Sequence, residues 1–191
     1  MKKHFSMLAA ALIAAGTFSA PVFAAEHYIS TNVGVSWINE IPTSSWQNLR
    51  TDAGTNMTAA LGCDYGAYRL EVEAGYQNND FSNNGNIKIL SLLGNGYINL
   101  KNEGARPYLT AGLGGAQVRL KDVTLGGQVR ESDDDTVIAY QVGAGVEVPI
   151  AKKAFFDVRY RYFGTADINT IFTGDRGIDS HNVLVGLRWN F

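Results

Sequence analysis

The sequence has few of the residues that cross-link or chelate in small exported proteins. It has one cysteine, Cys63, and therefore no internal disulfide. Its three histidines are scattered along the chain, and the sequence predicts no metal site and no cofactor. Only 4 prolines interrupt the 191 residues, whereas glycine occurs 21 times. The length fits one domain of roughly 100 to 200 residues.

Long apolar runs and an excess of positive charge are also missing. After residue 24 no run approaches the roughly 18 to 20 apolar residues that a membrane-spanning helix requires. Without Lys2 and Lys3 the chain keeps 14 of its 16 basic residues against 18 acidic ones, a net charge near −4. This balance argues against nucleic-acid binding.

The N-terminus has the features of an export signal. Lys2 and Lys3 precede an alanine-rich apolar run over residues 7–18, and residues 22–24 end in Ala24 with the small-x-small pattern of a cleavage site. No cysteine stands at this site to take a lipid. The expected organisation is a signal peptide over residues 1–24 and one domain over residues 25–191.

The last eleven residues, H-N-V-L-V-G-L-R-W-N-F, alternate with a period of two, which is typical of a β-strand with one apolar and one polar face. The apolar face ends in Trp189 and Phe191, where a free chain end would normally be polar and frayed. This pattern indicates a strand with lipid on one side and water on the other.

The same alternation predicts eight strands, at residues 28–37, 57–64, 68–77, 87–100, 108–120, 140–148, 156–163 and 181–191. Long polar connections are expected at residues 38–55, 78–86, 121–135 and 164–180, and short turns separate the other strands. An even number of strands with alternating long and short connections predicts an all-β fold, an eight-stranded antiparallel up-and-down transmembrane barrel.

Two details of the barrel follow from the pattern. The fifth strand changes the parity of its apolar residues between Leu113 and Ala116, which predicts a bulge near Gly114 and Gly115. Aromatic residues are expected to form two girdles at the membrane interfaces. The outer girdle would contain Trp37, Tyr140 and Tyr162, and the inner one Tyr68, Phe156, Trp189 and Phe191.

The chain resembles the small eight-stranded outer-membrane barrels of Gram-negative bacteria, the OmpA/OmpX/opacity-protein-like surface antigens. The resemblance covers the whole mature chain and is carried by Y-Q-V-G-A-G-V-E at 140–147, D-V-R-Y-R-Y-F at 157–163 and the terminal V-G-L-R-W-N-F. The last segment resembles the signal that the barrel-assembly machinery recognises, which implies a role in insertion for Gly186, Trp189 and Phe191. Members of the family include adhesins, complement-resistance factors and structural proteins.

Nine charged residues fall on the inward faces of the expected strands. They are Asp64, Arg69, Glu71, Glu73, Glu147, Asp157, Arg159, Arg161 and Arg188. An eight-stranded barrel is just wide enough for its own side chains to fill, so we expect a salt-bridge network that plugs the lumen. Strand pairing predicts Asp64 opposite Arg69, and Asp157 opposite Arg188. The alternative is a proton or ion path through these groups.

The four long connections hold 11 acidic and 4 basic residues, a net charge near −7. This sign disfavours docking on sulfated glycans or nucleic acid. The acidic run Asp133, Asp134 and Asp135 is expected in a solvated loop. Binding of a divalent cation there is the alternative, although hard cations need six or more oxygen ligands.

An enzyme would need a base beside a nucleophile. The only such pair at the outer rim is Ser180 and His181, and adjacent strand residues point to opposite faces, so the sequence predicts no catalytic site. Cys63 is expected to face lipid as a small apolar residue.

The sequence therefore predicts a monomeric outer-membrane barrel with both termini in the periplasm. Its role would be structural or surface-interacting, in the manner of adhesins and opacity proteins; the alternatives are a narrow pore and, third, a lipid A-modifying enzyme. Expected partners are membrane lipid, lipopolysaccharide, the barrel-assembly machinery and a host or envelope ligand at the long connections.

Overall fold

The protein is described from a computed structural model. It describes residues 25–39, 41–42, 48–49, 52–80, 85–101, 104–121, 123–125, 128–130, 133–166, 168–170 and 174–191. The expected signal peptide, residues 1–24, lies outside the described residues. The described residues include no helical segment with the length and hydrophobicity of a membrane span.

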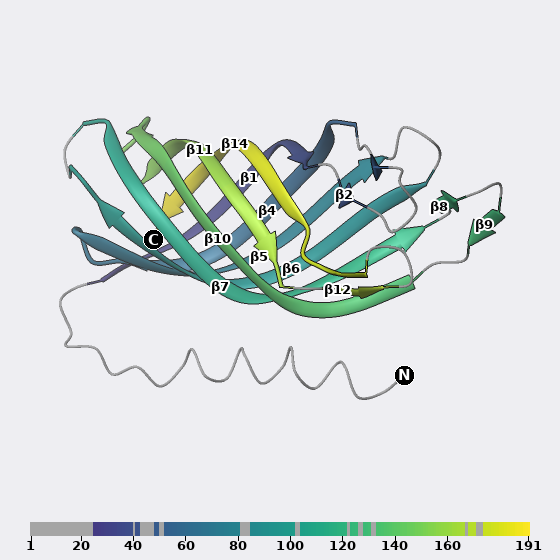
Figure 1. The fold of residues 1–191 in the computed structure, drawn as a ribbon. Helices are drawn as coiled ribbons and strands as arrows, with labels where there is room; N and C mark the ends of the chain where they lie inside the picture. Colours follow the sequence, from purple (N-terminus) through teal and green to yellow (C-terminus); the bar gives the residue numbers. More distant parts are fainter. Residues whose placement is uncertain are drawn as a thin grey trace.

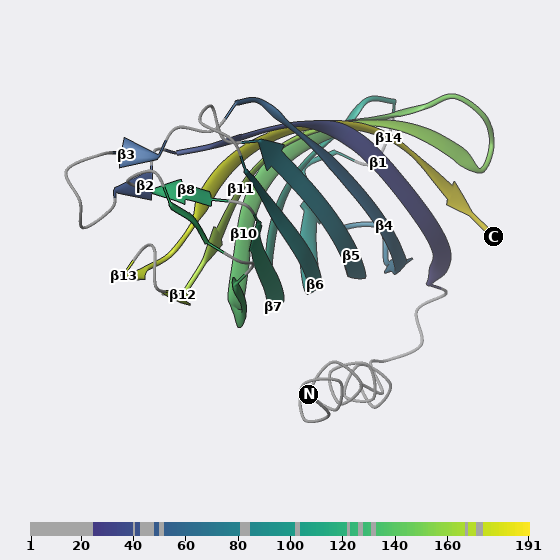
Figure 2. The same cartoon turned by 90° about the vertical axis from the view of Figure 1, so that its right-hand side faces the viewer.

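Eight antiparallel strands close into a barrel in the order β1-β14-β11-β10-β7-β6-β5-β4 (Figures 1 and 2). The strands are β1 (Glu26–Ile38), β4 (Gly54–Asp64), β5 (Tyr68–Asp80), β6 (Asn86–Asn99), β7 (Arg106–Lys121), β10 (Asp133–Pro149), β11 (Ala154–Thr165) and β14 (Asp179–Asn190). The first and last strands pair along eleven residues, from Tyr28 opposite Asn190 to Ile38 opposite Ser180. The predicted eight-stranded all-β barrel is confirmed.

Three of the four long connections contain additional two-stranded hairpins. The pairs are β2 (Ile41–Pro42) with β3 (Asn48–Leu49), β8 (Val123–Leu125) with β9 (Gln128–Arg130), and β12 (Ile168–Thr170) with β13 (Gly174–Arg176). In Figure 1 the labelled short strands lie at the end of the barrel opposite the C-terminus. We call this the long-connection end and the other the short-turn end.

The barrel strands extend further into the long connections than the sequence predicted. β5 continues to Asp80, and β10 already begins at Asp133, so the run Asp133 to Asp135 is strand and not loop. These three residues pair with Leu120, Arg119 and Val118 of β7. The polar composition that predicted a loop is compatible with a strand here because the β7–β10 ladder continues beyond the membrane-facing apolar band.

The predicted bulge in β7 is wrong. Gly114 lies opposite Leu93 and Ala139, and Gly115 lies opposite Leu92 and Ile138, in unbroken ladders on both sides. The parity of the apolar residues changes because the second half of the strand carries apolar side chains on its inward face instead.

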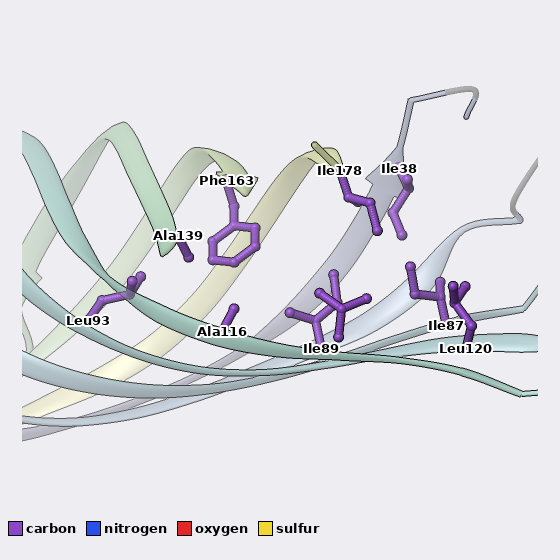
Figure 3. Packing of buried hydrophobic residues seen from close by; sticks show 10 residues of the cluster. Ile38, Ile87, Ile89, Leu93, Ala116, Leu120, Ala139, Phe163 and Ile178 are labelled. Carbon is purple, nitrogen blue, oxygen red and sulfur yellow. The ribbon is translucent and has the colours of Figure 1, made fainter. Parts of the chain in front are cut away.

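Those inward side chains belong to an apolar cluster that fills the lumen toward the long-connection end (Figure 3). The cluster consists of Ile38, Ile87, Ile89, Leu93, Ala116, Val118, Leu120, Ala139, Phe163 and Ile178. Each of these side chains is buried. The sequence pattern had indicated polar inward faces on the strands, so this part of the interior is of a different kind from the one predicted.

The outward face of the barrel is apolar. All eight barrel strands carry exposed large hydrophobic side chains, such as Leu61 at 62%, Leu113 at 65% and Trp189 at 55% relative exposure. A water-soluble fold would bury such residues, whereas a lipid-facing barrel presents them and keeps its charges inside.

Candidate functional site

The structure places all nine predicted luminal charges inside the barrel, each at most 7% exposed. A tenth charge joins them at the short-turn end: Arg106, whose guanidinium lies 4.0 Å from the carboxylate of Asp64. The sequence pattern missed it because residue 106 was assigned to a turn, whereas it is the first residue of β7. The cluster of ten, here called the charged plug, holds five carboxylates and five guanidinium groups and is formally neutral.

The half of the plug nearest the short-turn end is a chain of ion pairs from four strands. Arg69 of β5 pairs with Glu147 of β10. Arg188 of β14 lies 3.0 Å from the other oxygen of Glu147 and 2.8 Å from Asp64 of β4. Each charge therefore has a partner across the lumen, which is the arrangement that offsets the cost of burying it.

The predicted partners in this region were partly wrong. Asp64 does lie opposite Arg69 in the ladder, but its ion pair within hydrogen-bonding distance is with Arg188. Asp157 lies opposite Gly186 and not opposite Arg188, which faces Phe155. In a narrow barrel, long side chains reach across the lumen. The residue that pairs with a charged residue in the strand ladder is therefore not always the one that carries the closest opposite charge.

The central part of the plug is organised by Glu73. Its two carboxylate oxygens accept hydrogen bonds from Arg159 at 3.1 Å and from Arg161 at 2.7 Å. The side chain of Glu73 is fully buried. Arg159 also lies 3.8 Å from Asp157, which accepts a hydrogen bond of 2.7 Å from the Tyr108 hydroxyl. One carboxylate thus holds two guanidinium groups in the middle of the barrel.

Glu71 differs from the other acids, because no described arginine lies within ion-pair distance of it. Its oxygens accept hydrogen bonds from neutral donors, the closest being Tyr97 at 2.7 Å and Tyr28 at 3.1 Å. Ser30 and Asn95 donate to it at 3.3 Å. Glu71 therefore fixes the positions of two tyrosine rings.

Tyr28 and Tyr97, together with Tyr108, surround the guanidinium group of Arg69 and form an aromatic cage. The guanidinium carbon of Arg69 lies 4.4 Å from the ring centre of Tyr97, 4.8 Å from that of Tyr108 and 5.9 Å from that of Tyr28. Nε and Nη2 of Arg69 are buried without a hydrogen-bond acceptor among the described side chains. The negative faces of the aromatic rings supply the missing attraction through cation–π contacts.

Glycines make room for two rings of this cage. Tyr28 lies opposite Gly62, and Tyr108 lies opposite Gly145, in neighbouring strands. A β-carbon added at either glycine would overlap the facing ring. A glycine opposite a tyrosine on the inward face is the sequence signal that could have predicted the cage. Finding this signal requires the register between the strands, which the sequence pattern of one strand does not give.

Little free space remains inside the plug. One cavity lies among Arg69, Glu71, Glu147, Asp157 and neighbouring side chains, with about 10 Å³ open to the centre of a water-sized sphere. Such a volume holds about one water molecule. The side chains of the plug therefore pack closely around this cavity.

Toward the long-connection end, hydrogen-bonded side chains face the apolar cluster across the lumen. Asn56 donates to Asn182 at 2.7 Å, and Ser36 donates to Asn79 at 2.9 Å. Gln77 also donates to Asn79, at 3.1 Å. The residues of this amide network are 3% exposed or less, so this half of the lumen is filled as well.

No nucleophile and base come together at Ser180 and His181. Ser180 is buried in the lumen 3.3 Å from Gln77, while His181 faces outward with Nδ1 2.7 Å from the Tyr160 hydroxyl. Cys63 is half-buried on the outward face, with its sulfur 3.3 Å from Nδ1 of His27, a contact that the sequence pattern did not indicate. Within the described part of the chain, no three His, Cys, Asp or Glu side chains gather in a group that could hold a metal ion.

The residues proposed as an assembly signal lie at the seam between the last and first strands. Trp189 faces outward, and Gly186 lies opposite Asn32, whose amide a β-carbon at Gly186 would overlap. The amide nitrogen of Phe191 donates to the carbonyl of His27 at 2.9 Å, and the two rings are 6.3 Å apart. The Phe191 ring is 66% exposed, so it contributes little to internal packing.

Because the Phe191 ring is exposed, its role in membrane insertion can be tested separately from the stability of the folded barrel. We expect Phe191→Ala to lower the amount of barrel inserted into the membrane several-fold, while the inserted fraction unfolds at nearly the wild-type urea concentration. Heat-dependent gel mobility measures the first quantity and urea titration of purified protein the second. Ile150→Ala, which removes another exposed side chain at the short-turn end (60%), should leave both unchanged. A parallel fall in yield and stability for Phe191→Ala would contradict the expected role.

Solved structures show the same fold. Neisserial surface protein A, from Neisseria, superposes with a TM-score of 0.65 at 19% identity, over 86% of this chain and 97% of that one. Ail, the attachment invasion locus protein of Yersinia pestis, has a TM-score of 0.54 at 16% identity, over 87% and 99%. OprG of Pseudomonas aeruginosa has a TM-score of 0.54 at 14% identity, over 88% and 96%. No curated protein sequence matches the chain significantly.

The sequence itself matches a family over most of its length. Residues 10–191 fit the family described as the outer membrane protein beta-barrel domain. The closed antiparallel barrel, its apolar outer surface and its buried charges agree with that match. The chain therefore belongs to the outer membrane protein beta-barrel domain family, whose members reside in the cell outer membrane.

Proposed function

We propose that the protein is a structural or surface-interaction barrel and that its binding surface is formed by the four long connections. The observation that carries this proposal is the filled lumen. Buried side chains of the charged plug, the amide network and the apolar cluster lie along the interior, and the plug cavity has about 10 Å³ open to water. A narrow pore, the second function that the sequence leaves open, would need a continuous water path.

The orientation proposed for the barrel has both termini and the short turns in the periplasm and the long connections outside the cell. Barrels of this kind have short periplasmic turns and longer external loops. The structure supports the assignment through the hairpins β2–β3, β8–β9 and β12–β13, which all belong to the same end. Insertion of a monomer by the barrel-assembly machinery, next to lipopolysaccharide, is part of the same proposal.

The charge of the long connections limits the proposed partner. Ail has been solved in complex with the heparin analogue sucrose octasulfate, a polyanion. Residues 38–55, 78–86, 121–135 and 164–180, which include the long connections and the strand ends beside them, carry 11 acidic against 4 basic residues, so they would repel such a ligand. A neutral or basic surface of a host or envelope protein fits them better.

Replacing each long connection in turn by a short turn tests the proposal. Host and envelope components retained by the purified wild-type barrel should be lost with at least one of the four replacements. Replacement of the turn at 65–67 by another short turn is the control and should retain them. If no replacement changes binding, surface interaction is contradicted and a structural role remains.

Planar-bilayer recording separates the plugged barrel from the pore. We expect no stable conductance steps from wild-type protein, because the charges at the centre of the plug have ion-pair or hydrogen-bond partners and the plug cavity has room for about one water molecule. Reproducible single-channel steps would contradict the plug. A protein with all four connections shortened should remain equally silent, since the seal lies in the barrel itself.

A further inference from the structure

Two turns at the short-turn end share one pattern, an exposed aliphatic residue followed by lysine. Leu100 is 61% exposed and precedes Lys101. Ile150 is 60% exposed and is followed, after one alanine, by Lys152 and Lys153. All three lysines are exposed. Each turn thus combines an exposed apolar side chain with exposed lysine within three residues along the chain.

The two turns are neighbours around the rim. The first joins β6 to β7 and the second joins β10 to β11, and β7 pairs directly with β10. Near the rim this pairing places Arg106 opposite Glu147. The remaining turn, at 65–67, has the uncharged sequence Y-G-A. The positive charge is therefore concentrated on one arc of the rim, formed by the β6–β7 and β10–β11 turns.

Few acidic groups neutralise this arc. Among the described residues, no ion pair joins a carboxylate to any of the three lysines. Asp64 is engaged by Arg188 at 2.8 Å, and Glu26 accepts a hydrogen bond of 2.5 Å from Asn190. By sequence, the β6–β7 turn contributes one acid, Glu103, and the β10–β11 turn none. The arc has an excess of positive charge, whereas the long connections are acidic.

We propose that this arc, Lys101, Lys152 and Lys153 beside Leu100 and Ile150, binds the headgroups of anionic phospholipids in the adjoining membrane leaflet. The exposed aliphatic side chains set the arc at the boundary of the hydrocarbon, and the lysine stems reach from there into the headgroup layer. Lysines so placed are attracted to anionic lipid. The inference depends on the barrel lying in the membrane and not on the role proposed for the long connections.

Native mass spectrometry of the full-length mature barrel, released from mixed phosphatidylglycerol and phosphatidylcholine bilayers, tests this proposal. Wild type should retain phosphatidylglycerol in preference to phosphatidylcholine. The variant Lys101→Gln, Lys152→Gln, Lys153→Gln should lose that preference by at least about fivefold, the change that about 1 kcal/mol from a single lysine would give. Heat-dependent gel mobility verifies that the variant is folded.

Lys88→Gln is the matched control, because Lys88 lies on β6 near the long-connection end. It should keep the wild-type preference. Equal retention of the two lipids by wild type, an unchanged preference in the triple variant, or an equal loss in Lys88→Gln would each overturn the proposal. Loss of loop-dependent ligand binding with lipid preference intact would instead concern only the proposed function.

Discussion

Glu73→Leu should lower the free energy of unfolding by about 3–5 kcal/mol, the range found when one partner of a buried ion pair is removed. Glu73 is fully buried and accepts hydrogen bonds from both Arg159 and Arg161. Leucine leaves two guanidinium groups in the centre of the barrel without this carboxylate. Urea unfolding in detergent micelles, followed by tryptophan fluorescence, measures the loss.

Two further variants locate the effect. Glu26→Leu, at an exposed residue whose described contact is a hydrogen bond from Asn190, should change stability by much less. Adding Arg161→Met to Glu73→Leu should recover part of the loss, because it removes one of the two stranded cations. Arg159 keeps Asp157 at 3.8 Å and the Tyr97 hydroxyl at 2.8 Å. A double variant less stable than Glu73→Leu alone would contradict this explanation.

The sequence predicted the wall of the barrel well because lipid and lumen impose opposite polarity on alternate residues. In β5, for example, Tyr68, Leu70 and Tyr76 face outward while Arg69 and Glu73 are buried. A one-residue error in register would reverse every side chain, so the pattern fixes each strand separately. It does not say which strand lies across the lumen from which.

Two errors of prediction have that common origin. Arg188 was expected to pair with Asp157, its neighbour by strand order, but it reaches Asp64 and Glu147. The other error is the bulge predicted near Gly114 and Gly115, which was inferred because Val118 and Leu120 do not share the parity of the outward residues of the same strand. Inside the barrel they meet Ile87 and Ile89 from the neighbouring strand. Both outcomes depend on the barrel as a whole and not on any strand alone.

The apolar cluster and the charged plug should differ in the substitutions that they tolerate. In the apolar cluster, volume and shape decide the energy, and side chains of similar size can replace one another at small cost. In the charged plug, each group depends on several specific partners, as Glu71 does on Tyr28 and Tyr97. Substitutions in the plug should therefore be costly even when they conserve volume.

Gly145→Ala tests how tightly the aromatic cage fits. A β-carbon at residue 145 would overlap the Tyr108 ring and lie 2.7 Å from the carbonyl oxygen of Val158. The ring would have to move away from Asp157 and Arg69, which its hydroxyl and its face contact at 2.7 and 4.8 Å. Overpacking of this kind costs about 1–3 kcal/mol. Urea unfolding measures it, and near-ultraviolet circular dichroism should report the displaced tyrosine.

The same substitution at Gly96 separates this overlap from the general effect of a methyl group in a strand. Gly96 has no atom within 4 Å of an added β-carbon, and it lies between Leu70 and Ala111 on the lipid-facing side. Gly96→Ala should be neutral or slightly stabilising, because alanine loses less backbone entropy on folding than glycine. Equal losses at the two positions would mean that strand propensity sets the cost. A loss of stability confined to Gly145→Ala would show that the interior of the barrel has no room for a methyl group opposite Tyr108. The absence of a side chain at Gly145 would then be required for the packing of the plug, as its charged residues are.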